Sequence, residues 1–429
     1  MPYFGGIESK ADVSFVCGKH TFSFKIKEII MRKSFIAMAC VSALAAAGAV
    51  SAADVQLYGA IDSYVRVNHQ TGKTDVSLNS GGASGSYFGF QGTEDLSNGM
   101  QVAFKLESGY LSDNGTYAQS FAGNTSRIFH RESWVALRGP WGHIGFGRQY
   151  TPHFLTWAMS DVNGLSLGTA SSPFFYPHRT ATMGGDDPTI DDLVRRSNSI
   201  FYATPNMNGF TGYAFASLSE NDGKSSTRGN VYNLALQYVN GPLFLMGSAL
   251  YQKFDIQNHP DLGANVVAFP DGQVGIGDAG RNKRGGAQYY ELAASYDFGF
   301  TKPAIQLEYK KGNGAEAVAI NDPSMKVKFG DVFIGQIGTT TPMFGGRLNT
   351  TAAYLHDFDN DDADGYSVGI RYDYNLSKRT MLYVGIEALW NDKNAQRSIE
   401  AGPDSSWHVG TTKPGHDVQQ FFMGINHKF

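Results

Sequence analysis

Stretches in which apolar and polar residues alternate recur along most of this chain, and this pattern restricts the fold more than any other feature. Successive side chains of a β-strand point to opposite faces, so each stretch predicts a strand with one apolar and one polar face. Sixteen stretches follow the pattern, at 55–68, 84–93, 99–110, 126–138, 142–150, 197–204, 209–219, 229–239, 243–254, 287–297, 303–312, 328–337, 346–357, 365–374, 380–391 and 417–429. An all-β fold is therefore expected.

The gaps between these stretches alternate between short and long. The short gaps hold turn-forming residues, at Glu94–Asn98, Gly139–Trp141, Pro205–Asn208, Asn240–Pro242 and Asn375–Arg379. The long gaps hold polar loops, at 69–83, 111–125, 151–196, 255–286, 313–327 and 392–416. Tight turns at one end and long loops at the other are typical of outer-membrane barrels, and about sixteen strands leave an aqueous channel. We predict a 16-stranded antiparallel transmembrane β-barrel. A soluble β-sandwich, the alternative, would not need so many strands.

The two faces of each predicted strand can be assigned. In the first strand the apolar face carries Val55, Leu57, Ile61, Val65 and Val67, and the polar face carries Gln56, Asp62, Arg66 and Asn68. The stretch at 365–374 likewise places Val368, Ile370 and Tyr372 opposite Ser367, Arg371 and Asp373. A 16-stranded interior is too wide for side chains to fill. The polar faces are therefore predicted to line a water-filled lumen, and the apolar faces to meet lipid.

The two ends of the chain agree with export to an outer membrane. In the last strand Phe421, Met423, Ile425, His427 and Phe429 share one face, and an aromatic end suits an interfacial aromatic girdle. At the other end, residues 31–53 have the features of a secretory signal peptide.

The predicted signal begins with a basic start at Met31–Lys33. An apolar, Ala-rich run follows at 34–50, and then a small-residue cleavage site at which cutting after Ala52 or after Ala53 fits equally well. Residues 1–30 are interpreted as an upstream extension from a wrongly assigned start, with a cytoplasmic leader as the alternative. The remainder, 54–429, is predicted to form the barrel.

Removal of the signal changes the cysteine and charge balance. Cys17 and Cys40 both lie upstream of the cut, so a disulfide-stapled fold is excluded. The segment 54–429 retains 29 basic and 36 acidic residues, for a net charge of −7, which gives no indication of a nucleic-acid partner. No apolar run of 18 residues follows the signal, so no transmembrane helix is expected. A closed barrel is the other structure that can span a bilayer.

Short motifs follow one another along the predicted strands. In chain order they are Leu57–Gly59, Ile61–Asp62, Gly92–Leu96, Phe104–Gly109, Gly147–Tyr150, Arg195, Asn198–Ile200, Tyr202, Asn240–Pro242, Ser295–Phe298 and Leu376–Thr380. Each motif is weak alone, but their order and spacing together are specific. Over nearly all of the mature chain they resemble the Gram-negative trimeric porins, especially those of the neisserial and burkholderial type.

This resemblance implies a homotrimer in which a third loop folds into each barrel and narrows the pore. The longest gap, 151–196, fits that loop. Its acids are Asp161, Asp186, Asp187, Asp191 and Asp192, of which Asp161 is the favoured inward group. On the wall, Arg131 and Arg195 match arginines of related porins by motif position, while Lys105 and Arg66 face the lumen by parity.

The predicted constriction therefore consists of Arg66, Lys105, Arg131, Arg195 and Asp161. Further pore-lining residues are expected at Asp62, Tyr87, Gln91, Glu107, Arg371 and Asp373. Tyr87 and Gln91 stand where the family often has arginines, so the basic wall is thinner than usual in this chain.

The function implied by the resemblance is passive diffusion of small hydrophilic solutes and ions across the outer membrane of a Gram-negative bacterium. Opposed charges across a narrow wet gap would set its selectivity. Implied partners are outer-membrane lipid, lipopolysaccharide and the barrel-assembly machinery, which would read Phe429 as an assembly signal. No cofactor, metal or nucleic acid is expected. A substrate-specific channel is the alternative, and a barrel enzyme or an adhesin is more distant.

Three motifs match chemical sites but lie in the wrong context, so no enzyme is expected. The segment 164–168 matches G-x-S-x-G, whose serine needs a strand before it and a helix after it. The segment 275–280 matches G-x-G-x-x-G without a βαβ unit. The acidic run at 357–364 lacks the glycine of a calcium loop, so a solvated loop is expected, with weak divalent-cation binding as the alternative. Residues 174–176 are expected to pack the third loop against the wall, with a ligand surface as the alternative.

Overall fold

The computed structural model describes residues 13–17, 20–24, 54–70, 72–118, 128–175, 193–218, 230–253, 266–268, 274–277, 286–312, 315–319, 326–395, 397, 399 and 414–429. The predicted signal peptide lies outside these residues, as do Tyr176 and the loop acids Asp186, Asp187, Asp191 and Asp192. Two short strands, β1 (Val13–Cys17) and β2 (His20–Phe24), form a hairpin of their own. Within the described residues, none of the helices is long and apolar enough to cross a membrane.

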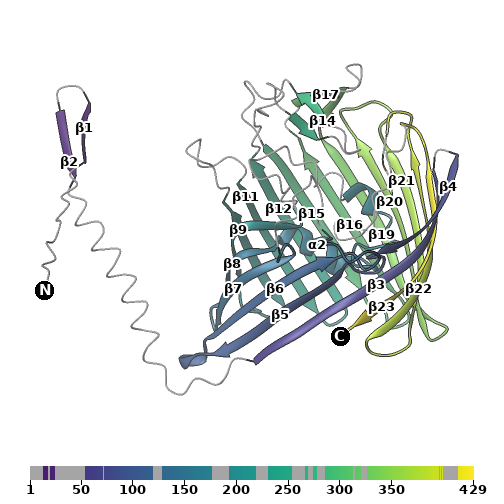
Figure 1. Ribbon diagram of the computed structural model, residues 1–429, viewed down its shortest axis with the longest axis horizontal. Coiled ribbons are helices and arrows are strands. Elements are labelled where there is room, and N and C mark those ends of the chain that lie inside the picture. Colours follow the sequence, from purple (N-terminus) through teal and green to yellow (C-terminus); the bar gives the residue numbers. More distant parts are fainter. Residues whose placement is uncertain are drawn as a thin grey trace, which may run out of the picture.

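The rest of the described chain forms a closed antiparallel barrel (Figure 1). Its strands are β3 (Asp54–Gln70), β4 (Lys73–Ser80), β5 (Ser86–Asp95), β6 (Gln101–Tyr110), β7 (Glu132–Gly139), β8 (Gly142–Tyr150), β9 (Arg195–Ala203), β10 (Phe210–Ser217), β11 (Val231–Asn240), β12 (Leu243–Lys253), β15 (Gly286–Tyr296), β16 (Lys302–Lys311), β19 (Val332–Met343), β20 (Gly346–Asp357), β21 (Gly365–Asn375), β22 (Thr380–Asn391) and β23 (Val418–Lys428). Because β4 and β5 pair with opposite halves of β3, they make one interrupted strand. Counted this way, the described strands confirm the predicted 16-stranded barrel.

The barrel closes where the last strand meets the first. β23 pairs antiparallel with β3 over eleven residue pairs, from Val418 with Gln70 to Lys428 with Ala60. Phe429 extends this ladder, because its backbone N donates to Gly59 O at 3.0 Å and its O accepts from Gly59 N at 3.2 Å. A closed ladder leaves no edge strand, which is the condition for a sheet to lie in lipid.

The two ends of the barrel differ as the gap lengths predict. Short turns and the C-terminus lie at one end, and the longer connections lie at the other (Figure 1). The turn between β19 and β20 is a two-residue turn in which Phe344 and Gly345 both have positive φ, at 49° and 77°. That geometry is favoured between twisted antiparallel strands.

The predicted faces are confirmed along the wall. On β3 the outward Val55 and Leu57 are 56% and 58% exposed, whereas the inward Asp62 and Asn68 are 0% and 2% exposed. β21 and β23 show the same alternation. The apolar set therefore faces the membrane, and the polar set faces inward.

Aromatic side chains form two belts on the outward face between β10 and β22. The belt near the long loops includes register pairs Tyr232 with Tyr251, Tyr290 with Tyr309, and Tyr366 with Trp390. The belt near the short turns includes Phe210, Tyr238, Tyr296, Phe298, Phe300, Phe344, Tyr372 and Tyr374. Such belts mark the two membrane–water interfaces of a transmembrane barrel.

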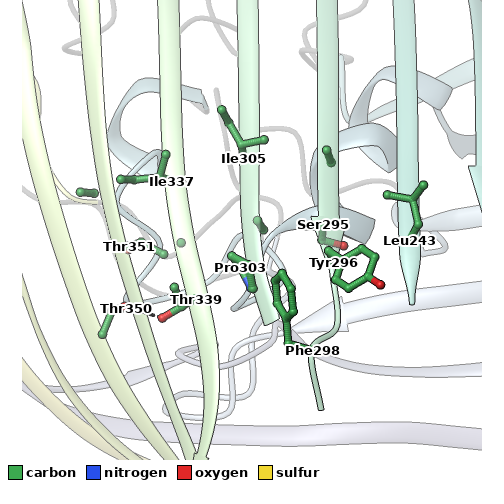
Figure 2. A pocket seen from close by; sticks show the side chains of 14 residues that line it. Leu243, Ser295, Tyr296, Phe298, Pro303, Ile305, Ile337, Thr339, Thr350 and Thr351 are labelled. Carbon is green, nitrogen blue, oxygen red and sulfur yellow. Dashed lines mark hydrogen bonds between the residues drawn. The ribbon is translucent and has the colours of Figure 1, made fainter. Parts of the chain in front are cut away.

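The outward face has an apolar groove of about 670 Å³ across β12, β15, β16, β19 and β20, which reaches the short-turn belt at Tyr296 and Phe298 (Figure 2). Ala294 and Ala352 are small residues in it, and Ile305 and Ile337 project from the strands beside them. All four belong to the outward set, so the groove faces lipid and is not part of the pore.

The prediction of one loop is wrong. The segment 69–83 was expected to be a polar loop, but β3 runs on to Gln70 and β4 begins at Lys73. Outward Val76 and Leu78 alternate with polar inward residues, and Gly72 supplies the positive φ of 72° that a tight turn needs. Only two apolar residues mark this strand, so its polar composition hid the alternation.

Two further loops contain strands. The gaps 255–286 and 313–327 include β13 (Val266–Ala268), β14 (Val274–Gly277) and β17 (Ala315–Ala319), which pair with β18 (Lys326–Phe329) in a four-stranded sheet at the long-loop end. The predicted stretch 328–337 therefore spans the end of β18 and the start of β19. The segment 275–280 begins on the antiparallel β14, so the described residues place no βαβ unit around it.

The third loop enters the barrel directly after β8. Thr151 caps α2 (Pro152–Ser160) by accepting from Phe154 N at 3.1 Å, and Pro152 occupies the first helical position. α2 packs on the inner faces of β11, β12, β15 and β16 (Figure 1). The expectation that 151–196 folds inward therefore holds for its described part, 151–175 and 193–196.

An apolar core lies between this loop and the wall. Trp157, Leu165, Leu167, Phe174 and Phe175 are buried, and they pack with the inward residues Val332, Ile334, Leu355, Leu389 and Phe422. The inward face is thus apolar where the loop covers it and polar elsewhere. Packing of Phe174 and Phe175 against the wall, rather than a ligand surface, is what the structure shows.

Candidate functional site

Amide side chains from two neighbouring strands hold the third loop on the inner wall. Gln306 of β16 donates from Nε2 to Trp157 O at 3.0 Å. Gln336 of β19 donates from Nε2 to Asp161 Oδ1 at 2.7 Å, and its Oε1 accepts from Ser171 N at 2.7 Å. Buried polar groups need such partners. These bonds therefore fix the end of α2 and the following turn to one place on the wall.

Asp161, the predicted constriction acid, ends α2 and organises the turn after it. Its Oδ2 accepts from Asn163 N and Leu165 N, both at 2.8 Å, and from Thr169 Oγ1 at 2.9 Å. Together with the bond from Gln336, four donors surround the carboxylate. By strand order β19 lies across the barrel from β7, so Asp161 is fixed on the wall opposite Arg131.

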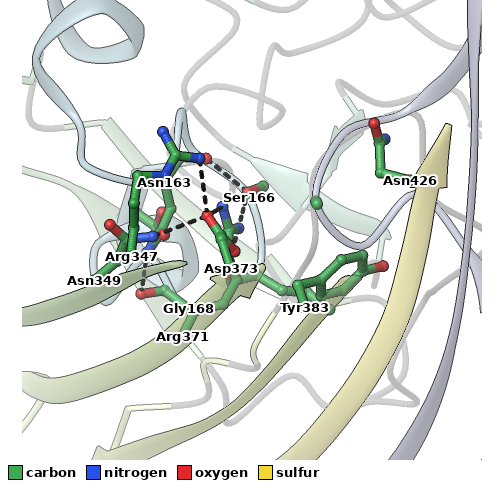
Figure 3. A network of polar contacts seen from close by, with 12 residues as sticks. Asn163, Ser166, Gly168, Arg347, Asn349, Arg371, Asp373, Tyr383 and Asn426 are labelled. Atoms are coloured by element: carbon green, nitrogen blue, oxygen red, sulfur yellow. Dashed lines mark hydrogen bonds and ion pairs between the residues drawn. The ribbon is translucent and has the colours of Figure 1, made fainter. Parts of the chain in front are cut away.

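Arg371 of β21 clamps the middle of the loop (Figure 3). Its Nη1 donates to Ser166 Oγ at 2.6 Å and to Leu167 O at 2.8 Å. Its Nε donates to Asp373 Oδ1 at 2.8 Å, and Asp373 also accepts from Asn349 Nδ2 at 3.0 Å. Arg371 and Asp373 were predicted to line the pore, and the structure shows them on the inner face, bound to the loop or to each other.

The G-x-S-x-G segment has a structural explanation in this loop. Gly164 and Gly168 have φ of 65° and 85°, a region that favours glycine. A Cβ on Gly168 would lie 3.0 Å from Arg371 Cβ, a tight contact that would force the loop or the wall to shift. Ser166 Oγ donates to Asn163 O at 2.7 Å and accepts from Arg371. The motif therefore shapes a turn.

Asp62 of β3 joins two other strands of the barrel and the segment between β4 and β5 at one carboxyl group. It accepts from the backbone N–H groups of residues 82–84 at 2.7 to 3.3 Å. It also accepts from Tyr383 OH at 2.7 Å and from Asn426 Nδ2 at 2.9 Å. This predicted pore-lining residue is fully buried, and its hydrogen bonds hold the strands together near the seam where β23 meets β3.

The segment that Asp62 holds is the break between β4 and β5. Residues 81–85 leave the wall ladder there, and Gly82 O accepts from Leu167 N of the third loop at 3.0 Å. A Cβ on Gly82 would lie 2.2 Å from Tyr383 Oη, so only glycine fits. The interruption of the strand thus gives the loop another anchor on the wall.

Charged side chains gather on the wall formed by β6 and β7. Lys105 Nζ lies 2.6 Å from Glu132 Oε1 and 3.2 Å from Glu107 Oε2. Arg131 Nε lies 2.6 Å from Glu107 Oε1, and Tyr58 OH donates to Glu107 Oε2 at 2.7 Å. These alternating signs hold each long side chain in one geometry, because a side chain with two partners has less freedom to rotate.

Aromatic rings continue this cluster towards β8 and β9. The guanidinium of Arg131 lies 4.8 Å from the ring centre of Tyr87, and that of Arg195 lies 4.5 Å from the ring centre of Tyr150. Arg195 Nη2 also donates to Tyr150 OH at 2.6 Å. Cation–π contacts of this kind keep the positive charge while they orient the group.

The structure brings together some of the predicted site residues and separates others. Lys105, Arg131, Glu107 and Tyr87 form one cluster, and Arg195 extends it through Tyr150. Six predicted residues lie elsewhere, and Asp62, Arg371 and Asp373 among them are described above. Arg66 bonds Asp75 across the β3–β4 hairpin at 3.2 Å, Gln91 donates to Gln56 at 3.1 Å, and Asp161 lies on the far wall.

Several residues of the site were missed in the sequence. They are Tyr58, Glu132, Tyr150, Gln306, Gln336 and Glu387, the last of which accepts from Gly168 N at 3.1 Å. Parity places Tyr58, Gln306 and Glu387 on inward faces, so strand alternation could have found them. Nothing in the sequence shows that they contact the third loop or the charged cluster.

One group of described residues could hold a metal ion. His153, Glu291 and Glu308 offer ligand atoms within 4.8 Å of one another. The two ring nitrogens of His153 face different carboxylates, at 2.7 Å for Glu291 and 3.8 Å for Glu308. A metal site needs donors that converge on one point, and an imidazole that bridges two carboxylates does not provide this.

A closed membrane barrel whose polar lumen is narrowed by an infolded loop defines the class of outer-membrane diffusion channels. A family model described as Gram-negative porin matches residues 37–394. The chain belongs to this family, and it is an outer-membrane porin.

The relatives agree with this assignment. Outer membrane porin protein 32 of Delftia acidovorans is 29% identical over 409 residues, covering 93% of this chain and 100% of the relative. Major outer membrane protein P.IB of Neisseria gonorrhoeae is 27% identical, covering 86% and 97%. An anion-selective porin from Comamonas acidovorans has a similar solved structure, with a TM-score of 0.66 and 24% identity over 88% of this chain and 100% of that one.

Proposed function

We propose that the selectivity of this porin is set where the wall of β6–β9 faces the third loop. The observation that carries this proposal is the cluster of Lys105, Arg131 and Arg195, held in place by Glu107 and by tyrosine rings. The predicted constriction residue Asp161 lies on the opposite wall. Charges of opposite sign on facing walls give a field across the lumen, which orients small polar solutes and biases ion passage.

On the β6–β9 wall the three cations outnumber Glu107 and Glu132, and the carboxylate of Asp161 on the opposite wall already accepts from four donors, so we expect a preference for anions. Purified protein in planar bilayers under a KCl gradient should show stepwise conductance. Its reversal potential should lie nearer to the equilibrium potential of chloride than to that of potassium. The double variant Arg131→Ala, Arg195→Ala should move the reversal potential towards cation preference. Arg379→Ala, at an exposed turn of the short-turn end, is the matched control. An unchanged reversal potential in the double variant would place selectivity elsewhere.

A substrate-specific channel remains the alternative within the same family. It predicts that one class of solute blocks the ionic current at low concentration, whereas an open diffusion channel shows no such block. We also propose that the chain has no hydrolase activity. The sequence matches G-x-S-x-G at 164–168 and again at 365–369. Ser166 bonds Asn163 O and Arg371 and has no histidine among these partners, and Ser367 lies inside β21 rather than at the strand-to-helix turn that such a serine needs.

We propose that the protein is a homotrimer that associates through the β3–β4 face. Within the described residues of β3 and β4 the outward positions carry aliphatic side chains, including Val55, Leu57, Val65, Val76 and Leu78, and no aromatic residue. The aromatic belts described above run from β10 to β22 and do not include β3 or β4. A face that lacks interfacial aromatics suits contact with protein rather than with a lipid headgroup region. Light scattering of the protein in detergent tests the mass.

A further inference from the structure

His153 is the only titratable residue of α2, and it lies between two carboxylates of the barrel wall. Its Nδ1 is 2.7 Å from Glu291 Oε2 of β15, and its Nε2 is 3.8 Å from Glu308 Oε2 of β16. The three side chains are 0 to 1% exposed. Each ring nitrogen therefore faces its own carboxylate in a place closed to bulk water.

Every element packed around the imidazole contributes to its surroundings. β11 presents the neutral Asn233, whose Oδ1 accepts from His153 N at 2.6 Å, and Asn233 in turn donates to Ser248 of β12 at 2.9 Å. β15 adds the ring of Tyr289, 5.3 Å away, and the loop adds Phe175, stacked at 6.3 Å.

β16 contributes the one further charge that these contacts include. Lys310 lies two residues beyond Glu308 on the same face and attracts it electrostatically. Among the described residues, the charged groups that these contacts include are Glu291, Glu308 and Lys310.

The protonation state of the ring decides how many of these contacts are attractive. A protonated imidazole has two N–H groups and can donate to Glu291 and Glu308 at once. A neutral imidazole has one, so its other nitrogen turns a lone pair towards a carboxylate. Histidine is the side chain that ordinarily changes charge between about pH 5 and pH 8. A change of pH in that range alters the attachment of α2 to the wall.

We propose that His153 is a positioning residue that holds the third loop on the wall when it is protonated and loosens it when it is neutral. The inference deepens the channel function and rests on it, since the third loop bounds the lumen. The N-terminal turn of α2 is then the part of the constriction that responds to pH. The anchors further along, Gln336 and Arg371, keep the rest of the loop in place.

Thiol labelling can measure this attachment, because residues 54–429 contain no cysteine. Thr156→Cys places a thiol on the buried face of α2, and Met159→Cys places one on its exposed face. The ratio of their labelling rates by a charged thiol reagent cancels the pH dependence of the reagent. With the native histidine, we expect this ratio to rise about tenfold between about pH 5.5 and about pH 8.5, the factor expected for loss of one charge-assisted hydrogen bond.

Variants of His153 and Glu308 separate a pH-dependent role from a merely structural one. His153→Gln should give a ratio that does not change with pH. Glu308→Gln should shrink the pH step, because its amide can donate to the neutral ring. His427→Gln, at the exposed end of β23, is the control and should leave the step unchanged. A flat ratio in the native background, or a step that persists in His153→Gln, would overturn the proposal.

Conductance of the same preparations distinguishes failure of the proposal for His153 from failure of the channel function. Protein that conducts at both pH values with a flat labelling ratio would refute the role of His153 alone. Protein that is silent at both pH values would refute the channel itself. If the proposal holds, the alkaline current should also fluctuate more than the acid current, and His153→Gln should fluctuate equally at both.

Discussion

Replacement of Asp62 by alanine tests whether the seam of the barrel and the third loop depend on one side chain. Five groups donate to the Asp62 carboxyl: three backbone N–H groups of residues 82–84, Tyr383 OH and Asn426 Nδ2. The variant Asp62→Ala leaves all five without this acceptor. The N–H of Gly82 and the hydroxyl of Tyr383, at 2.7 Å each, make the shortest of these bonds.

The expected loss of stability follows from these two short bonds. A buried donor left unsatisfied costs about 1–3 kcal/mol, so two of them cost about 2–6 kcal/mol. The other three donors add less, because residues near them can shift. The variant also no longer buries a carboxyl group, and this gain offsets part of the total. With about 2.1 cal/mol/K of unfolding entropy per residue, this corresponds to a drop in the melting temperature of about 3–8 °C.

Thermal unfolding in detergent, followed by circular dichroism and by the gel mobility of unheated protein, measures this drop. Asp95→Ala, at the exposed end of β5, is the matched control and should change the melting temperature little. Because Gly82 O also holds Leu167, the Asp62 variant should in addition show a noisier single-channel current. A melting temperature equal to that of the control would refute the reasoning that this carboxyl group joins the seam to the loop.

Three further perturbations have expected outcomes. Deletion of Phe429 removes two backbone bonds to Gly59 and the proposed assembly signal, so the yield of folded protein in outer membranes should fall severalfold; normal yield would contradict the role of this residue. Gly168→Ala forces a residue with φ of 85° to carry a Cβ, at about 1–2 kcal/mol plus the contact with the wall, and should lower the melting temperature without abolishing conductance. At the long-loop end, burial raises the pKa of Asp364, but hydrogen bonds from Tyr354 and His356 outweigh it and bring the pKa below its ordinary value of 3.8. The loop after β20 should therefore be most stable above that value and loosen as the pH falls below it, which hydrogen exchange in residues 357–364 would detect.

The wall of the barrel could be predicted from the sequence because it depends on local alternation. Val55 and Leu57 lie outside and Asp62 inside, as parity requires, and each of the sixteen predicted strands has a counterpart. β4 was missed because two apolar residues are too few to show a period. The strands at 266–268 and 315–319 were missed because they are short and lie in loops.

The contacts of the third loop could not be predicted in the same way. Gly168 bonds Glu387, 219 residues away, and Ser171 bonds Gln336, 165 residues away. Parity shows that Glu387 and Gln336 point inward, but it does not show which side of the lumen the loop follows. For the same reason Asp161 was recognised as a loop acid, while its contact with β19 was not.

The uneven placement of the aromatic belts has a mechanical consequence. A single subunit would be anchored at both membrane interfaces along the wall from β10 to β22, and the outward surface of β3 and β4 would be mostly aliphatic. Unequal anchoring would let one subunit alone lean in the bilayer and thin or thicken the lipid beside it. In the proposed trimer the β3–β4 faces would meet around a common axis, and the aromatic belts would face lipid on every side. The axis of each barrel would then stay perpendicular to the bilayer.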